Sequence, residues 1–278
     1  MHLKKKLFIT VLTYPNPSHK YIETVCTAGL TESGDWIRVY PIKLRMLDTR
    51  IQKYGWYILD IEPRDRNKDN RKESYYCISP PEECIEHIGP DNNWKARKEI
   101  CLKNVFYNFK NLETASDTQR KDFISLATFK PKELVDFIAE PKDCQKEESK
   151  KEEILNNLRM QGDLINQDIP EYWEMAQSIP FTFYYKFKDD SGEIYKLMIE
   201  DWEVMMLYRN CIKHGKEKAL HDIKKKYLED FRKRDIYFFL GTRRKAHIRR
   251  WKNPFSIIGV FYPPIEIQPE FDFTTPGK

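Results

Sequence analysis

Residues 236–262 read IYFFLGT-RRKAHIRRWKNP-FSIIGVFY, and this stretch says more about the fold than any other part of the chain. Its two ends, Ile236–Thr242 and Phe255–Tyr262, are short and strongly apolar. Apolar runs of this length, bounded by polar and turn-forming residues, are typical of buried strands. The segment between them is basic. The sequence therefore predicts two interior strands that hold a cationic loop at both of its ends.

The residues before this stretch predict a hairpin followed by two helices. Phe181–Lys188 (FTFYYKFK) and Ile194–Ile199 (IYKLMI) flank the turn residues 189–192 (DDSG), which is a strong hairpin pattern. Asp201–Cys211 then changes to helical spacing. Lys216–Arg234 is amphipathic, with one apolar stripe along a predicted helix.

The N-terminal part is rich in short apolar segments with turns between them. Four of these segments are predicted strands: Lys6–Thr13, Tyr21–Ala28, Trp36–Tyr40 and Tyr54–Ile61. Residues 81–110 are expected to be helical in parts, and Asp117–Leu126 is expected to begin another helix. We therefore predict an α+β protein with a β-rich N-terminal sheet or small barrel and a C-terminal hairpin–helix–helix–strand–strand unit.

The chain divides into three parts by composition. Residues 1–140 form the β-rich half, residues 141–160 are a charged linker or exposed helix, and residues 161–278 form the α+β half with the basic loop. Charged residues dominate the middle segment and aromatic residues are absent from it, which is typical of a boundary. We expect both halves to share one core.

Composition excludes several classes of protein. The chain has 278 residues, of which 40% are hydrophobic and 14% aromatic, so it is long and apolar enough to build a packed core. No apolar run is long enough to cross a membrane, and the one after the basic N-terminus is too short for a signal peptide. We therefore expect a cytoplasmic protein without a membrane partner.

The six cysteines and the missing motifs narrow the chemistry further. No pair of cysteines has CxxC spacing, and no two histidines lie three to five residues apart. Structural zinc sites usually contain such pairs, so we expect no metal and no cofactor. The sequence also lacks GxxxxGK[ST], GxGxxG, HExxH and GxSxG, which argues against P-loop, Rossmann, zincin and α/β-hydrolase enzymes.

The basic loop is the sharpest functional feature. Within ten residues it carries six cations, one histidine and one tryptophan. Closely spaced Arg and Lys favour phosphate, and an aromatic plane beside them favours an unstacked base. The alternative is a solvated basic loop without a ligand. The candidate nucleic-acid-binding residues are Thr242, Arg243, Arg244, Lys245, Arg249, Arg250, Trp251 and Lys252.

The candidate catalytic residues are Asp201, Glu203 and His247. Asp201 and Glu203 lie where a strand passes into a helix, and either could activate water or stabilise a cationic intermediate. The structural alternative is that Asp201 caps the helix. His247 lies among cations that disfavour its protonation, so it is able to accept a proton, although a surface histidine without a role is the alternative.

A second polar site is possible in the N-terminal half. Arg71 and Glu73 lie in a charged loop between strands and are placed to face Arg38 and Tyr40 of the WIRVYP strand. The alternative is that this loop is a solvated turn.

Several motifs resemble a family of uncharacterised bacterial proteins. They are Cys26–Gly29 (CTAG), Trp36–Pro41 (WIRVYP), Asp201–Glu203 (DWE) and Phe238–Thr242 (FFLGT), and the resemblance spans most of the chain. Relatives of this kind carry a cysteine pair in the hairpin that corresponds to residues 189–193, and this chain has none there. The family is loosely similar to phage-defence proteins, among them DNA glycosylase-like enzymes that remove modified bases.

These observations lead to one working hypothesis and two alternatives. We expect a nucleic-acid-acting protein, with DNA as the expected partner, that hydrolyses a base–sugar bond in foreign (phage) DNA. One alternative is a non-catalytic reader of modified or single-stranded nucleic acid. The other is a protein-interaction module whose basic loop meets an acidic partner.

Overall fold

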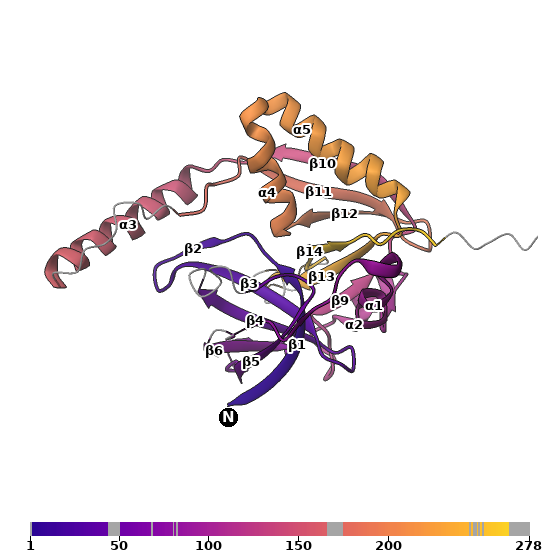
Figure 1. The fold of residues 1–278 in the computed structure, drawn as a ribbon, viewed down its shortest axis with the longest axis horizontal. Helices are drawn as coiled ribbons and strands as arrows, with labels where there is room; N and C mark the ends of the chain where they lie inside the picture. Colours follow the sequence, from indigo (N-terminus) through magenta and orange to yellow (C-terminus); the bar gives the residue numbers. More distant parts are fainter. Residues whose placement is uncertain are drawn as a thin grey trace, which may run out of the picture.

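The computed structural model describes residues 2–43, 51–67, 69–79, 81, 83–165, 175–244, 246, 249, 251 and 253–266. Its architecture is α+β with a β-rich N-terminal half, as the sequence predicts. Two seven-stranded sheets form the body of the protein, one below the other in Figure 1.

The N-terminal sheet closes on itself. Its strands are β1 (Leu3–Leu12), β2 (Asn16–Ser18), β3 (Ile22–Leu30), β4 (Trp36–Lys43), β5 (Gly55–Pro63), β6 (Ser74–Ser79) and β7 (Glu86–His87). The order β1–β3–β4–β6–β5 returns to β1, because β5 also pairs with β1. Five strands thus make a small closed barrel, whose interior is filled by buried side chains such as Leu7, Val39 and Tyr57.

The C-terminal sheet is open and mixed. In spatial order its strands are β10 (Glu133–Pro141), β11 (Phe181–Lys188), β12 (Ile194–Ile199), β14 (Phe255–Phe261), β13 (Tyr237–Thr242), β9 (Leu126–Phe129) and β8 (Val105–Phe106). β11 and β12 form the predicted hairpin, in which Phe183 lies opposite Ile199. β13 and β14 pair antiparallel and every residue of both strands is buried, which confirms them as interior strands.

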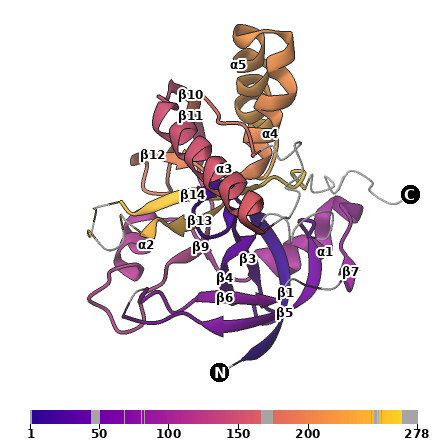
Figure 2. The same cartoon turned by 90° about the vertical axis from the view of Figure 1, so that its left-hand side faces the viewer.

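Helices cover the outer face of the C-terminal sheet. α4 (Trp202–Cys211) and α5 (Lys216–Lys224) stand above β10, β11 and β12, as Figure 2 also shows. After α5 the chain continues as a π-helix, Lys225–Asp230, instead of the single α-helix predicted. There the carbonyl of Tyr227 accepts a hydrogen bond from the Tyr185 hydroxyl of β11, which competes with the regular helical pattern.

The remaining helices are peripheral. α1 (Asp91–Cys101) and α2 (Phe109–Ala115) flank the two sheets, and α3 (Gln145–Ile165) projects from the body beside β2 (Figure 1). The charged segment 141–160 thus lies at the end of β10 and on α3. None of the helices in the described ranges is long and apolar enough to cross a membrane.

The predicted helix start at Asp117–Leu126 is wrong. Residues 117–122 form turns, and β9 begins at Leu126. The Asp117 carboxylate accepts a hydrogen bond from the backbone N–H of Gln119, so the side chain closes a turn on its own backbone instead of starting a helix.

The two sheets are joined by a shared apolar cluster. Phe8 of β1 and Trp36 of β4 pack with Phe239 of β13 and Phe261 of β14 in one cluster, and the ring centroids of Trp36 and Phe239 are 5.2 Å apart. Aromatic pairs at this distance contribute packing beyond their buried area. The gap between the barrel and the open sheet is therefore packed on this side, and it opens into a cavity on the side of β2 and β12.

Candidate functional site

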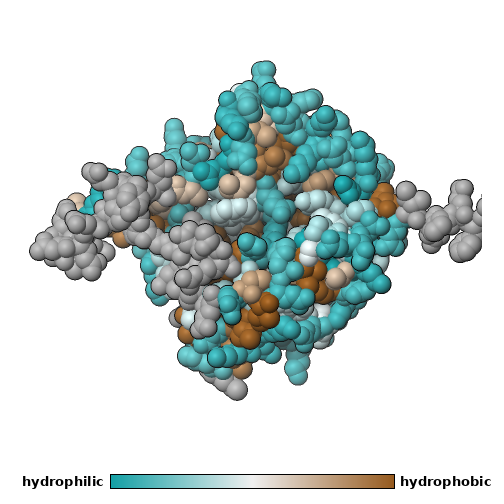
Figure 3. Space-filling view, viewed as in Figure 1, coloured by the Kyte–Doolittle hydropathy of each residue, from teal (hydrophilic) through white to brown (hydrophobic). Residues whose placement is uncertain are grey.

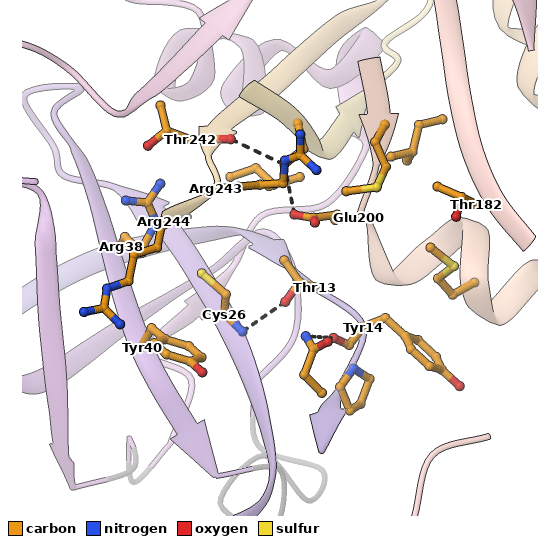
Figure 4. A pocket seen from close by; sticks show the side chains of 18 of the residues that line it. Thr13, Tyr14, Cys26, Arg38, Tyr40, Thr182, Glu200, Thr242, Arg243 and Arg244 are labelled. Atoms are coloured by element: carbon orange, nitrogen blue, oxygen red, sulfur yellow. Dashed lines mark hydrogen bonds between the residues drawn. The ribbon is translucent and has the colours of Figure 1, made fainter. Parts of the chain in front are cut away.

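A cavity of about 590 Å³ lies between the barrel and the open sheet. Six of its described lining residues carry cationic side chains and two carry carboxylates, so its wall favours an anionic or acceptor-rich ligand. Figure 4 shows Arg38, Tyr40 and Arg244 along one side and Arg243 and Glu200 opposite them. The charged lining residues are Arg38, Arg64, Arg71, Lys142, Arg243, Arg244, Glu147 and Glu200.

Arg38 forms the deepest part of the wall. It lies on β4 of the barrel and is only 4% exposed. Its Nη1 donates to Ser74 Oγ (3.2 Å) and Ser125 Oγ (2.9 Å), and its Nη2 donates to Ser125 O (3.1 Å). Burial, together with the neighbouring Arg71 guanidinium, lowers the pKa of Arg38 to about 10. The cation is therefore held by neutral oxygens in a site that penalises its charge.

Glu73 supports Arg38 from behind. Its carboxylate accepts hydrogen bonds from the backbone N–H of Ser125 (2.8 Å) and from Ser125 Oγ (3.1 Å). Ser125 thus stands between this carboxylate and the Arg38 guanidinium. Glu73 does not line the cavity, whereas Tyr40, two residues beyond Arg38 on the same face of β4, does.

Arg71 is the second buried arginine. Its Nε and Nη2 donate to the two carboxylate oxygens of Asp69, both at 2.7 Å, and its Nη1 donates to Thr242 O at 2.8 Å. The loop between β5 and β6 is therefore no solvated turn at this point. It binds the end of β13 and neutralises most of the charge of Arg71 within the protein.

Glu200 provides a carboxylate inside the cavity. It directly follows β12, and its backbone N–H donates to Ile257 O of β14 at 2.7 Å. Its side chain accepts a hydrogen bond from Ser256 Oγ at 2.9 Å. Burial raises the pKa of Glu200, and the Ser256 hydrogen bond and the nearby Arg243 offset only part of that rise. Catalytic acids and bases are often carboxyl groups that lie in a cavity and have a raised pKa.

The predicted catalytic residues Asp201 and Glu203 lie elsewhere. Asp201 is fully buried, accepts hydrogen bonds from Glu203 N (3.2 Å) and Val260 N (3.0 Å), and forms an ion pair with Lys53 at 2.8 Å. The capping interpretation of Asp201 is thus confirmed. Glu203 forms an ion pair with Lys53 at 3.4 Å. Neither carboxylate lines the cavity.

The carboxylate that faces the cavity belongs to the residue directly before Asp201, and the alternation of side chains in extended backbone explains this difference from the prediction. Side chains of consecutive residues in extended backbone point to opposite sides, and Asp201 still has extended dihedral angles before α4 begins. When Asp201 points inward to cap the helix, Glu200 must point into the cavity. We therefore reassign the candidate catalytic carboxylate from Asp201 and Glu203 to Glu200.

The start of the basic loop reaches the cavity. Thr242, Arg243 and Arg244 line it, and the Arg243 guanidinium lies 5.2 Å from the centre of the Trp251 ring. Within the described part of the chain, the buried atoms Thr242 Oγ1 and Arg243 Nε have no hydrogen-bond partner. Unpaired buried donors next to a cavity point to a polar ligand or to bound water.

The rest of the loop is only partly described. Arg249 and Trp251 are exposed and do not line the cavity. Lys245, His247, Arg250 and Lys252 lie outside the described residues. The predictions for these four residues stay predictions.

Several lining residues were not predicted from the sequence. They come from four segments that are far apart in the chain: Tyr14, Cys26, Arg64, and the ion pair Lys142–Glu147. Arg64 is a loop residue without a local motif. Of the cavity residues that were not predicted, Glu200 is the one that the sequence could have indicated, because strand alternation places its side chain opposite that of Asp201. Among the described residues no cluster of three or more metal-ligating side chains is present.

Comparison with known families divides the chain close to the start of the open sheet. Residues 3–103 match the model of a family described as Domain of unknown function (DUF8758), and residues 107–275 match another, Domain of unknown function (DUF8757). No curated protein matches the chain. The cavity draws on both matched regions. Because the second match covers more than half of the sequence, this chain belongs to the DUF8757 family.

Proposed function

We propose that this protein binds nucleic acid, takes one nucleotide into the cavity between its two sheets, and hydrolyses the bond between base and sugar. The observation that carries the proposal is the meeting of Glu200 with Arg38, Arg71 and Arg243 in one cavity. Base-processing enzymes extrude their target nucleotide into such a pocket because its reactive atoms are inaccessible inside a duplex.

Size and charge support a nucleotide as the occupant. About 590 Å³ lies within the range of ordinary small-molecule sites. Arg243 and Arg244 come from the loop that leads away from the cavity, Arg244 is exposed, and guanidinium groups bind phosphate oxygens in pairs. Trp251, 44% exposed and close to Arg243, offers an aromatic plane for a neighbouring base.

Glu200 suits the hydrolytic step. In base–sugar hydrolysis positive charge develops on the sugar, and a carboxylate either stabilises it or accepts a proton from the attacking water. A raised pKa makes a carboxylate a stronger base, and the nearby Arg243 offsets part of the rise. No other described carboxylate in the cavity wall has these properties, because Glu147 is held by Lys142 at 2.6 Å.

The alternative of a protein-interaction module has less support. Figure 3 shows a face that is mostly hydrophilic, with apolar areas that are small and separate. Of the exposed large apolar side chains in the described ranges, Ile58 lies on β5 and Ile85 directly before the adjoining β7 of the N-terminal sheet, whereas Ile194 lies on β12 of the other sheet. Large continuous apolar patches often mark protein-binding sites. A non-catalytic reader would use the same cavity, and Glu200 separates it from an enzyme, as discussed below.

The proposal is tested by following base release. Single-stranded and duplex DNA, with normal and modified bases, is incubated with the full chain, and free base is measured by chromatography together with abasic sites. We expect release of a base from at least one substrate. DNA that is bound but stays intact with every base tested would identify a reader.

Loss of the loop cations is expected to weaken nucleic-acid binding in a salt-dependent manner. We expect the triple variant Arg243→Ala, Arg244→Ala, Arg249→Ala to bind DNA more weakly. Its plot of log affinity against log salt becomes less steep by up to about three, since each lost phosphate contact on duplex DNA removes roughly 0.9. The measurement is fluorescence anisotropy at several salt concentrations.

A matched control removes equal charge elsewhere. Lys4→Ala, Lys225→Ala and Lys226→Ala together remove three exposed cations that do not line the cavity. We expect this variant to keep most of the wild-type slope. Equal losses in both variants would show that only overall charge attracts DNA.

A further inference from the structure

Arg38 has one edge that is not paired with an oxygen atom of any described residue. A guanidinium carries five N–H groups. Both hydrogens of Nη1 go to Ser74 and Ser125, and one hydrogen of Nη2 goes to Ser125 O. Among the hydrogen bonds to oxygen in the described residues, the Nε–H and the second Nη2–H of Arg38 are left, and the Cys26 thiol is a further, weak hydrogen-bond partner of this guanidinium. These two donors point the same way and form the fork that binds two acceptors side by side.

Arg71 shows what this fork does when it has a partner. In Arg71 the same two atoms, Nε and Nη2, bind both carboxylate oxygens of Asp69 at 2.7 Å. Arg38 lies in the same cavity wall, and no carboxylate of a described residue contacts it directly, because Ser125 separates it from Glu73. Among the described residues, one buried fork is thus bound by a carboxylate, whereas the other meets no acceptor stronger than a thiol.

Two neighbours keep the Arg38 fork accessible. Gly241 of β13 lies so close that a Cβ atom there would be 3.3 Å from Arg38 Nη2 and 2.9 Å from Ile258. The Cys26 thiol forms a side-chain hydrogen bond with this guanidinium, and burial raises the pKa of the thiol against the influence of Arg38. A protonated thiol is only a weak acceptor, so it does not replace a carboxylate or carbonyl.

The depth of Arg38 decides which part of a nucleotide reaches it. Arg38 is 4% exposed, whereas Arg244 is exposed. The phosphates of an intact strand stay connected to neighbours outside the protein, so they meet the outer arginines. Only the extruded base is free to reach the floor. Two adjacent acceptors on a base, such as O6 and N7 of guanine, are the usual partner of an arginine fork.

We propose that the Nε–Nη2 edge of Arg38 binds O6 and N7 of a 6-oxopurine base at the floor of the cavity. This inference rests on the proposed function and names its substrate class. A purine is also the larger of the two base types and makes fuller use of the cavity.

The same contact assists bond breaking. When the C1′–N9 bond of the nucleotide breaks, its electron pair goes to the base, and negative charge spreads to N7 and O6. Water adds to C1′ of the sugar and its proton passes to Glu200. The departing base takes up one proton at nitrogen, which Glu200 returns directly or through solvent water, so that one water molecule is consumed for each base released. Arg38 stabilises the departing base electrostatically, because its charge is not neutralised by a carboxylate in contact.

The inference is tested by nucleoside binding to the full-length protein, without turnover. Guanosine, 7-deazaguanosine and adenosine are compared by isothermal titration. 7-Deazaguanosine lacks the N7 acceptor, and adenosine carries an amino donor in place of O6. We expect guanosine to bind roughly five- to hundred-fold more tightly than either analogue, the range for one bidentate contact.

Variants assign the preference to the fork. Arg38→Lys keeps the charge but has no fork, so we expect guanosine to lose its advantage over 7-deazaguanosine. Arg232→Lys is the matched control, because Arg232 also uses Nε and Nη2, but on the carbonyl of Leu134 away from the cavity. The wild-type comparison stands even if Arg38→Lys does not fold.

Other outcomes overturn the inference. Equal binding of guanosine and 7-deazaguanosine by the wild type would do so. So would equal binding of guanosine monophosphate and 7-deazaguanosine monophosphate, since N7 would then make no contact with the fork of Arg38. Failure of the proposed hydrolysis can be told apart from failure of this inference. In that case base release is absent, but the preference for guanosine over 7-deazaguanosine remains.

Discussion

Glu200→Gln abolishes base release and leaves nucleic-acid binding close to that of the wild type: this is the largest functional effect that we expect. Glutamine keeps the size of the side chain and can still accept the hydrogen bond from Ser256. It cannot accept a proton from water or balance positive charge on the sugar. Loss of a general base commonly slows turnover by about 10²- to 10⁴-fold.

Two controls make this prediction specific. Glu203→Gln changes a carboxylate three residues away that pairs with Lys53 outside the cavity, and we expect it to retain turnover. Single-turnover rates and DNA affinity are measured for both variants. If Glu200→Gln turned over like the wild type, Glu200 would have no chemical role and the reader alternative would gain its strongest support.

The pH dependence of turnover reports on the same carboxyl. Burial raises the pKa of Glu200 above its usual value of 4.5, so we expect protonation to stop turnover at a higher pH than for an ordinary glutamate. The Ser256 hydrogen bond lowers this pKa. We therefore expect Ser256→Ala to move the acidic limb of the kcat/KM profile to higher pH. An unchanged limb would mean that another group controls it.

The largest stability effect is expected for Asp201→Ala. Asp201 connects three elements: it caps α4, accepts from Val260 N of β14, and pairs with Lys53 before β5 of the barrel. Burial lowers the pKa of Lys53, but the Asp201 and Glu203 carboxylates outweigh it and raise that pKa above its usual value. Removing Asp201 leaves a nearly buried ammonium without its main partner, which costs about 3–5 kcal/mol.

Denaturant unfolding of the full-length protein measures this cost. Lys53→Met in the Asp201→Ala background removes the uncompensated charge, so the double variant is expected to recover part of the loss. Glu203→Ala, at the partly exposed end of the same cluster, should cost no more than about 1 kcal/mol. A loss below that value for Asp201→Ala would contradict the structural role assigned to it.

The secondary structure was largely predictable because it depends on local patterns. The hairpin of β11 and β12 follows from alternating aromatic residues around DDSG, and β13 and β14 follow from continuous apolar runs. The failures were also local. At Asp117 a side chain bonded its own backbone, and at Tyr227 a carbonyl found a partner on β11. Propensity and periodicity do not contain such competing hydrogen bonds.

The candidate site was predictable only in fragments. The basic loop and the pair Arg38 and Arg71 were each recognised, because clustered charge and a polar residue in a strand are visible in the sequence. That these fragments form one cavity was not visible, since Arg38 and Gly241 are separated by some two hundred positions and meet only where the barrel faces the open sheet.

The amino-acid pattern alone determined the class of fold, the buried strands and the cationic character of one loop, because hydropathy and charge act over a few residues. Only the tertiary structure decided that Glu200 and not Asp201 faces the cavity, and that among the described residues a carboxylate binds the fork of Arg71 but not that of Arg38. The physical reason is that burial and hydrogen-bond partners come from contacts between distant segments, and these contacts determine which of several similar side chains remains available to a ligand.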